Sequence, residues 1–125
     1  LSYNNLGGGG FGGISMALNC LSYGNAQHGF FPYNIGGTYM NCIAESNGTQ
    51  GWLGGTSRYT LINSASYLNG TARSSVTTGA VFDIGAVLGT GSFFTNAAAA
   101  DFSLNNIAGR GALCRETGFP NTFPV

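Results

Sequence analysis

Residues able to perform acid–base or nucleophilic chemistry are few and widely spaced in this sequence. The 125 residues include four carboxylates, four Arg residues and one His. Enzymatic glycoside hydrolysis needs two carboxyl groups facing one substrate, but Glu45 has a Tyr 22 residues away on either side and Asp83 lies in an irregular stretch. His28 has Gln50 at the same 22-residue offset, so no carboxylate accompanies it as a general base. We therefore predict no catalytic residues.

The spacing of the cysteines allows one disulfide and does not fit a metal site. Three Cys and one His at these spacings do not match a zinc site, so no metal and no other cofactor is predicted. Cys20 and Cys42 are 22 residues apart and would lie in neighbouring turns of a 22-residue repeat, within reach of a disulfide. The alternative is that both are small buried thiols. Cys114 is expected to stay free.

Aromatic side chains recur in two rows at nearly the same interval. Because successive side chains of a strand point to opposite faces, one row would lie inside the fold and the other outside. The row of Tyr23, Glu45 and Tyr67 holds a charge and is expected outside, as a glycan-contacting stripe or as an ordinary solvated face. The row expected in the core is Phe11, Phe30 and Trp52.

Tyr23, Glu45 and Tyr67 belong to a short sequence motif, here called the phrase, that occurs three times with a period of 22 residues. Each copy has a large apolar residue, an Asn, and a second Asn six residues later. The five residues between the two Asn suit a short strand, and such a period is typical of a β-solenoid. Equivalent Asn side chains in stacked strands could form ladders of amide hydrogen bonds. The two expected ladders are Asn19, Asn41 and Asn63, and Asn25, Asn47 and Asn69.

Two of these Asn residues also fit the N-glycosylation acceptor pattern. Asn47 and Asn69 are each followed by Gly-Thr. However, Asn-Gly is equally suited to a tight corner of the backbone. An Asn side chain that is buried in a ladder cannot carry a sugar, and we favour the corner interpretation.

The phrase from Asn41 to Gly48, followed by Gly51 and Trp52, resembles the coils of the right-handed parallel β-helix, or pectate-lyase-like, superfamily. Segments 93–97, 101–104 and 109–114 are similar to the C-terminal coils and cap of bacterial surface and phage-type β-helix proteins. The resemblance implies an all-β solenoid of about four to five coils of about 22 residues with an irregular C-terminal cap. The coils would occupy residues 1–95 and the cap residues 96–125. Lyases, hydrolases, tailspikes and inert surface proteins share this fold, so it implies little about activity.

Charge and hydropathy exclude several classes of partner. The formal net charge is zero, so the sequence predicts no basic patch for nucleic acid or anionic lipid. No apolar run reaches the length of a membrane-spanning helix, and no membrane insertion is expected. The sequence opens at Leu1 within a coil phrase, which suggests a processed chain or part of a longer solenoid.

These features predict a non-catalytic structural or adhesive module of an extracellular, cell-surface or virion assembly, such as a surface filament or a phage fibre. An uncapped N-terminal end would allow coils to stack end to end. A lateral trimer is the alternative assembly, and cell-surface polysaccharide is a further expected partner. The competing functions are a fragment of a lyase-like or hydrolase-like carbohydrate-active enzyme, and a glycan-binding module.

Overall fold

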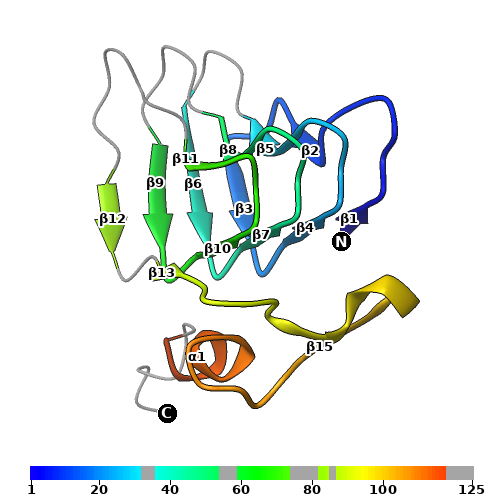
Figure 1. The fold of residues 1–125 in the computed structure, drawn as a ribbon. Coiled ribbons are helices and arrows are strands. Elements are labelled where there is room, and N and C mark those ends of the chain that lie inside the picture. The colour runs from blue at the N-terminus through cyan, green and yellow to red at the C-terminus, as the bar shows by residue number, and fades with distance from the viewer. Residues whose placement is uncertain (32–35, 54–58, 74–81, 85–86, 118–125) are drawn as a thin grey trace.

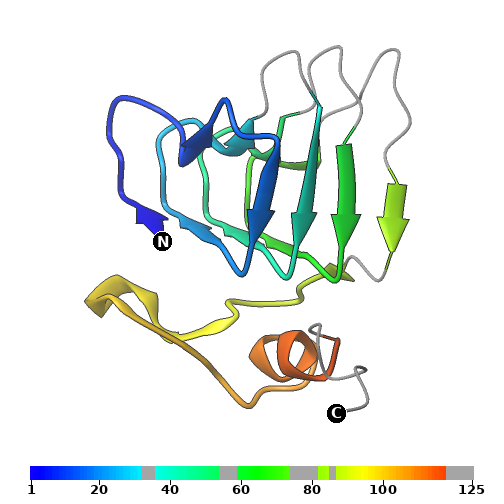
Figure 2. The ribbon, with the colours of Figure 1, turned by 180° about the vertical axis from the view of Figure 1, so that it is seen from behind.

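The computed structural model describes residues 1–31, 36–53, 59–73, 82–84 and 87–117. Within these residues the chain is mostly β-structure, with strands arranged in several parallel sheets, one short 3-10 helix and one α-helix. The strands of each parallel sheet lie side by side along the stack, and the three sheets surround a common interior (Figures 1 and 2). This arrangement is consistent with a solenoid-like fold.

The three parallel sheets take successive strands of the chain in turn. Sheet A has the order β1 (Ser2–Tyr3), β4 (Leu21–Tyr23), β7 (Ile43–Glu45), β10 (Ala65–Tyr67), β13 (Val87–Leu88). Sheet B has the order β2 (Phe11–Gly12), β5 (His28–Phe31), β8 (Gln50–Trp52), β11 (Thr71–Arg73). Sheet C has the order β3 (Met16–Leu18), β6 (Gly37–Met40), β9 (Tyr59–Ile62), β12 (Phe82–Ile84). We call three successive strands, one in each sheet, a coil.

The register of the strands follows the repeat in the sequence. Tyr23 pairs with Glu45 in sheet A, and Glu45 pairs with Tyr67. The first coil is shorter, so Tyr3 pairs with Tyr23 at an interval of 20 residues. Equivalent residues of successive coils therefore lie directly beside one another in the described residues, which is the condition that side-chain ladders require.

The backbone turns sharply at the first Asn of each phrase. Asn19, Asn41 and Asn63 have φ angles of 52°, 53° and 46°. Asn tolerates this left-handed conformation better than other residues with a side chain. These three Asn therefore occur at the junction between sheet C and sheet A because the corner there needs a positive φ.

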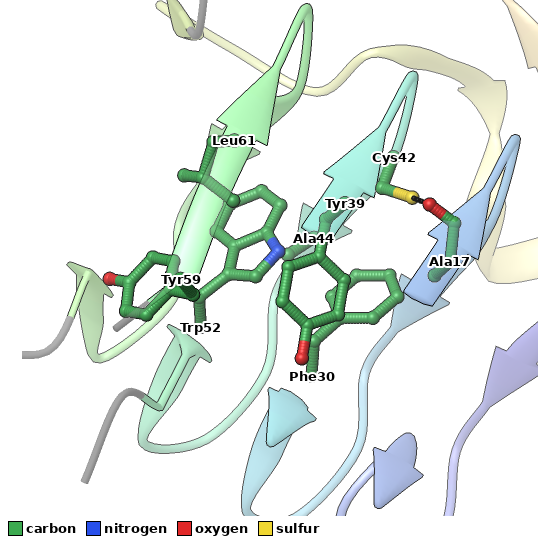
Figure 3. Packing of buried hydrophobic residues seen from close by; sticks show 8 residues of the cluster. All are labelled: Ala17, Phe30, Tyr39, Cys42, Ala44, Trp52, Tyr59 and Leu61. Carbon is green, nitrogen blue, oxygen red and sulfur yellow. Dashed lines mark hydrogen bonds between the residues drawn. The ribbon is translucent and has the colours of Figure 1, made fainter. Parts of the chain in front are cut away.

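Large side chains fill the space between the sheets (Figure 3). The rings of Phe11, Phe30 and Trp52 form a row, with centroids 5.0 and 5.6 Å apart and nearly parallel planes. Phe30 and Trp52 are fully buried, and Tyr39 and Leu61 pack beside them. This agrees with the core position expected for the row. Burial of such rings supplies a large part of the stabilisation of each coil.

The C-terminal segment, residues 89–117, covers the outer face of sheet A. It contains β14 (Phe94–Asn96), a 3-10 helix (Ala97–Ala99), β15 (Asp101–Leu104) and α1 (Gly111–Thr117), and β14 pairs with β15 in antiparallel fashion. The segment lies alongside the parallel strands in Figures 1 and 2. A cap over residues 96–125 was expected at the end of the stack, but residues 96–117 lie along a sheet face. Residues 118–125 are outside the described part.

Apolar side chains on sheet A explain this placement. Leu21, Ile43 and Ala65 occupy equivalent positions and belong to one apolar cluster with Phe93 and Phe94. Such a row would be costly to leave in water. The covering contacts begin at Phe93, before the boundary expected at residue 96.

Candidate functional site

An open cleft of about 660 Å³ lies between sheet A and the C-terminal segment. Sheet A contributes Tyr23, Glu45 and Tyr67 to its lining. The C-terminal segment contributes Ser92, Asn105 and Arg110, among others. The sequence predicted that Tyr23, Glu45 and Tyr67 lie in one row. The repeat did not predict that the C-terminal segment forms the opposite wall of the cleft.

Glu45 is a carboxylate in the lining of this cleft, and the residue is only 2% exposed. Its carboxylate accepts a hydrogen bond of 2.9 Å from the backbone N–H of Phe93 and another from the side chain of Ser92. Burial raises the pKa of Glu45, and the two hydrogen bonds partly oppose this effect. The contacts of Glu45 therefore tie the C-terminal segment to the third coil.

The two Tyr residues beside Glu45 also contact the C-terminal segment. The ring of Tyr23 makes edge contacts with Phe94 and Phe102, with centroids 6.2 and 5.5 Å apart. Tyr67 makes a similar contact with Phe93 at 6.2 Å. The row points away from the coil interior as expected, but it does not form a free glycan stripe. The chain itself covers much of it, because the aromatic rings gain more from packing than from exposure.

Asn105 organises the far wall of the cleft. Its Nδ2 donates hydrogen bonds to the carbonyl oxygens of Ser92 and Phe94, and its Oδ1 accepts from the N–H groups of Ile107 and Gly111. One side chain thereby holds three parts of the segment together. Sequence analysis missed this residue, because it lies outside the repeat and no spacing marks it.

A ladder of amides runs through the second corner of the coils. The Nδ2 of Asn25 donates to the Oδ1 of Asn47 at 2.9 Å, and the Nδ2 of Asn47 donates to the Oδ1 of Asn69 at 2.8 Å. Asn5 joins the ladder through a 2.7 Å bond to Asn25. Asn25 and Asn47 are buried. The Nδ2 of Asn69 donates to the carbonyl oxygen of Ala44, so both candidate glycosylation amides are hydrogen-bonded within the fold.

The ladder expected at the first corner is more exposed. The Nδ2 of Asn41 donates to the Oδ1 of Asn19 at 3.0 Å, near the surface. Asn63 occupies the equivalent position in the next coil and has the same left-handed backbone. The two Asn of the phrase thus differ: the first sets a backbone corner, and the second forms the buried ladder.

The cysteines are free thiols in the structure. The disulfide considered between Cys20 and Cys42 is therefore absent. The sulfur of Cys42 lies 3.4 Å from the carbonyl oxygen of Ala17, and that of Cys20 lies 3.3 Å from the carbonyl oxygen of Leu18. Each thiol is directed at a backbone acceptor. Burial raises the pKa of Cys42 to about 12, which is expected of a thiol packed in a core.

His28 has a structural contact and no catalytic partner in the described part of the chain. Its Nδ1 lies 2.8 Å from the hydroxyl oxygen of Thr49. Partial burial lowers its pKa. The described residues also contain no group of three or more His, Cys, Asp or Glu side chains that could hold a metal ion.

The second candidate site is the N-terminal edge, the open side of β1, β2 and β3. Each of these strands is the last of its sheet and has a neighbour on one side only. Among the described residues, seven large hydrophobic side chains are exposed, and five lie in the first coil. These five are Leu1, Tyr3, Leu6, Met16 and Leu18. Unpaired strand edges with apolar side chains are able to pair with further strands.

None of the helices in the described ranges is long and apolar enough to cross a membrane. Comparison of the chain with protein-family models, with curated proteins and with solved structures finds no match.

Proposed function

We propose that this chain is a non-catalytic structural or adhesive module of an extracellular, cell-surface or virion assembly. Its coils would form a right-handed parallel β-helix of the pectate-lyase-like kind. The module would join its assembly by coil stacking at the N-terminal edge, as in a surface filament or a phage fibre.

The observation that carries this proposal is the N-terminal edge. Three parallel sheets end there at β1, β2 and β3, and β3 carries Met16 and Leu18, which are 62% and 51% exposed. Natural proteins usually protect such edges with charges, Pro or short covering elements. Residues 1–18 contain no charged residue and no Pro, so the edge is suited to receiving another coil.

The use of Glu45 supports a structural role for sheet A. A catalytic acid or base must reach the substrate proton that it transfers. Glu45 instead binds the N–H of Phe93 and is almost fully buried. Its contacts hold the C-terminal segment in place.

The proposal is tested by adding a coil to the N-terminal edge. The stretch from Leu21 to Cys42 contains β4, β5 and β6, the strands of the second coil, and ends directly before Ile43, which pairs with Leu21. A copy of residues 21–42 fused ahead of Leu1 therefore enters in register. The N–H of Asn4 is already bonded to the second coil, whereas that of Tyr3 belongs to the open side. Stacking predicts slower hydrogen exchange at the Tyr3 N–H and a higher unfolding midpoint.

A matched control is the same fusion carrying Met16→Lys, which places a charge on the receiving edge. We compare it with Leu68→Lys, since Leu68 is similarly exposed but lies in the fourth coil. The first substitution should weaken protection of Tyr3, and the second should not. A fused coil that leaves the Tyr3 N–H unprotected, in a chain whose core amides remain protected, contradicts the proposal.

Glycan binding is a second candidate, and the cleft favours it. The cleft presents Tyr67 and Arg110 beside Glu45, and concave sites with aromatic walls and a few polar groups are common ligand sites. A glycan array tests this with Tyr67→Phe, which keeps the contact with Phe93 and removes the hydroxyl. Saccharide binding that this variant weakens would support the candidate, and an array without any binding would contradict it.

A further inference from the structure

The buried ladder has a direction. The Oδ1 of Asn47 accepts hydrogen bonds from the backbone N–H and from the Nδ2 of Asn25, at 3.2 and 2.9 Å. The Oδ1 of Asn69 accepts the same pair from Asn47, at 2.9 and 2.8 Å. Because a backbone N–H can only donate, the atom facing it must be oxygen. Each Asn therefore donates to the coil that follows it and accepts from the coil that precedes it.

The first member of this ladder has an unused acceptor. Asn5 donates to Asn25 through its backbone N–H and through its Nδ2. Its Nδ2 also donates to Ser2, and no described residue donates to its Oδ1. Asn5 is exposed at the N-terminal edge. At the later coil boundaries, the Oδ1 in the equivalent position accepts a hydrogen bond from the Asn of the preceding coil.

The aromatic row ends in the same way. Phe11 stacks on Phe30 at 5.0 Å with planes 5° apart, and this is its ring contact within the described residues. In the next coil, Phe30 has a ring on both sides, Phe11 and Trp52. The open face of Phe11 thus lies at the same end of the stack as the open acceptor of Asn5.

At the opposite end of the stack, the described residues do not supply the matching groups. Ser66 pairs with Leu88 in sheet A, 22 residues later in the chain. The same offset makes Gly91 the equivalent of Asn69 in the next coil. Trp52 pairs with Arg73 in sheet B. A second copy stacked head to tail would place Gly91 at the ladder position, which requires an amide. It would place Arg73 at the position of the aromatic row, which requires a flat ring.

We infer that the N-terminal edge is specific for a β-coil that carries an Asn at its second corner and an aromatic residue in sheet B. The C-terminal end of a second copy is not its partner. This inference rests on the proposed function, and it names the occupant of the proposed stacking surface. This partner differs from the end-to-end self-association that the repeat suggested. Asn meets Asn and ring meets ring only where one coil of the repeat stacks on another.

The experiment compares two fused coils. Both are copies of residues 21–42 placed ahead of Leu1, and one has its copy of Asn25 replaced by Ala. The copied Asn25 is the fifth residue of the fused coil, as Asn5 is of the chain, so the two residues are in register. We expect the Asn coil to slow exchange of the Tyr3 N–H on the order of tenfold more than the Ala coil, since an unpaired acceptor at the boundary weakens stacking. The chain without a fused coil should stay monomeric in light scattering as its concentration rises.

The outcomes separate this inference from the proposed function. Equal protection by both fused coils overturns the Asn specificity and leaves coil stacking intact. No protection by either coil overturns the proposed function itself. Self-association of the unfused chain that Met16→Lys abolishes and Leu68→Lys preserves would show that a second copy fits the edge, which also overturns the inference. Protection of the Phe30 and Trp52 amides in every variant establishes that the coils are folded.

Discussion

The carboxylate of Glu45 accepts a 2.9 Å hydrogen bond from the backbone N–H of Phe93, 48 residues later in the chain. This contact joins the third coil to the C-terminal segment. It also places an acidic side chain where water has little access. The energetic consequence depends on whether the carboxyl group is charged.

Stability should therefore depend on pH through Glu45. Its pKa is raised in the folded state by burial, whereas an unfolded Glu titrates near about 4.3. The contribution of Glu45 is fully present below the unfolded pKa and is lost as the pH rises through the folded pKa. Glu45→Gln should reduce the change of the unfolding free energy with pH in this range. Urea unfolding of both chains between pH 4 and pH 8 measures the difference.

Asp101 provides a control of opposite sign. Hydrogen bonds from Ser103 lower the pKa of Asp101, so its contribution is present above the unfolded pKa and is lost as the pH falls. Asp101→Asn should reduce the loss of stability in acid.

If Glu45→Gln left the pH dependence of the unfolding free energy unchanged, the carboxylate of Glu45 would not be buried as described.

The two Asn positions of the phrase should respond differently to mutation. Asn47→Ala removes a buried amide that serves three neighbours, Ser22, Asn25 and Asn69, and should cost about 2 to 3 kcal/mol of unfolding free energy. Asn41→Gly should cost less than about 1 kcal/mol, because Gly accepts the positive φ of 53° and the hydrogen bond to Asn19 is exposed. Chemical unfolding measures both values. Equal costs would mean that both positions act as ladders.

Phe102 should be needed to hold the C-terminal segment. Its ring contacts Tyr3, Tyr23 and Phe94 with centroid distances of 5.3, 5.5 and 5.5 Å. Phe102→Ala should destabilise the chain by about 2 kcal/mol and speed proteolysis between residues 93 and 115. Ile107→Ala is the control, since Ile107 is half exposed and its loss should change stability by less than about 0.5 kcal/mol. Cleavage that both variants speed equally would argue against the role of Phe102.

The thiols should be slow to react in the folded chain. Burial raises the pKa of both Cys42 and Cys114 to about 12, and the charge of Glu45 adds to the effect at Cys114. Little thiolate is then available to attack an alkylating reagent at pH 8. Mass spectrometry should show slow labelling of these two residues in the folded chain and rapid labelling of all three Cys in urea. Rapid labelling of folded Cys42 would place it outside the core.

The parallel strands and their register were predictable because the repeat fixes them. The 22-residue steps of Tyr23, Glu45 and Tyr67 reappear as strand pairs in sheet A. A period of this kind reports neighbours in space, because equivalent residues of a stack lie one strand apart. The inward position of Phe30 and Trp52 followed from alternation along the strands.

The cover over sheet A was not predictable in the same way. Phe93 and Phe102 lie outside the repeat, so no period relates them to their partners. Burial of Glu45 depends on those partners, and a charge in the sequence normally indicates exposure. The different roles of Asn41 and Asn47 also depend on backbone angles, which residue type alone does not specify.

The C-terminal segment changes how the chain should fold. In a simple solenoid each coil contacts only its neighbours, and the ends can open independently. Here Phe102 contacts the first two coils through Tyr3 and Tyr23, and Phe93 contacts the third and fourth through Glu45 and Tyr67. All four coils should therefore unfold together. During synthesis, the apolar face of sheet A would stay open to water or to a chaperone until residues 89–117 leave the ribosome.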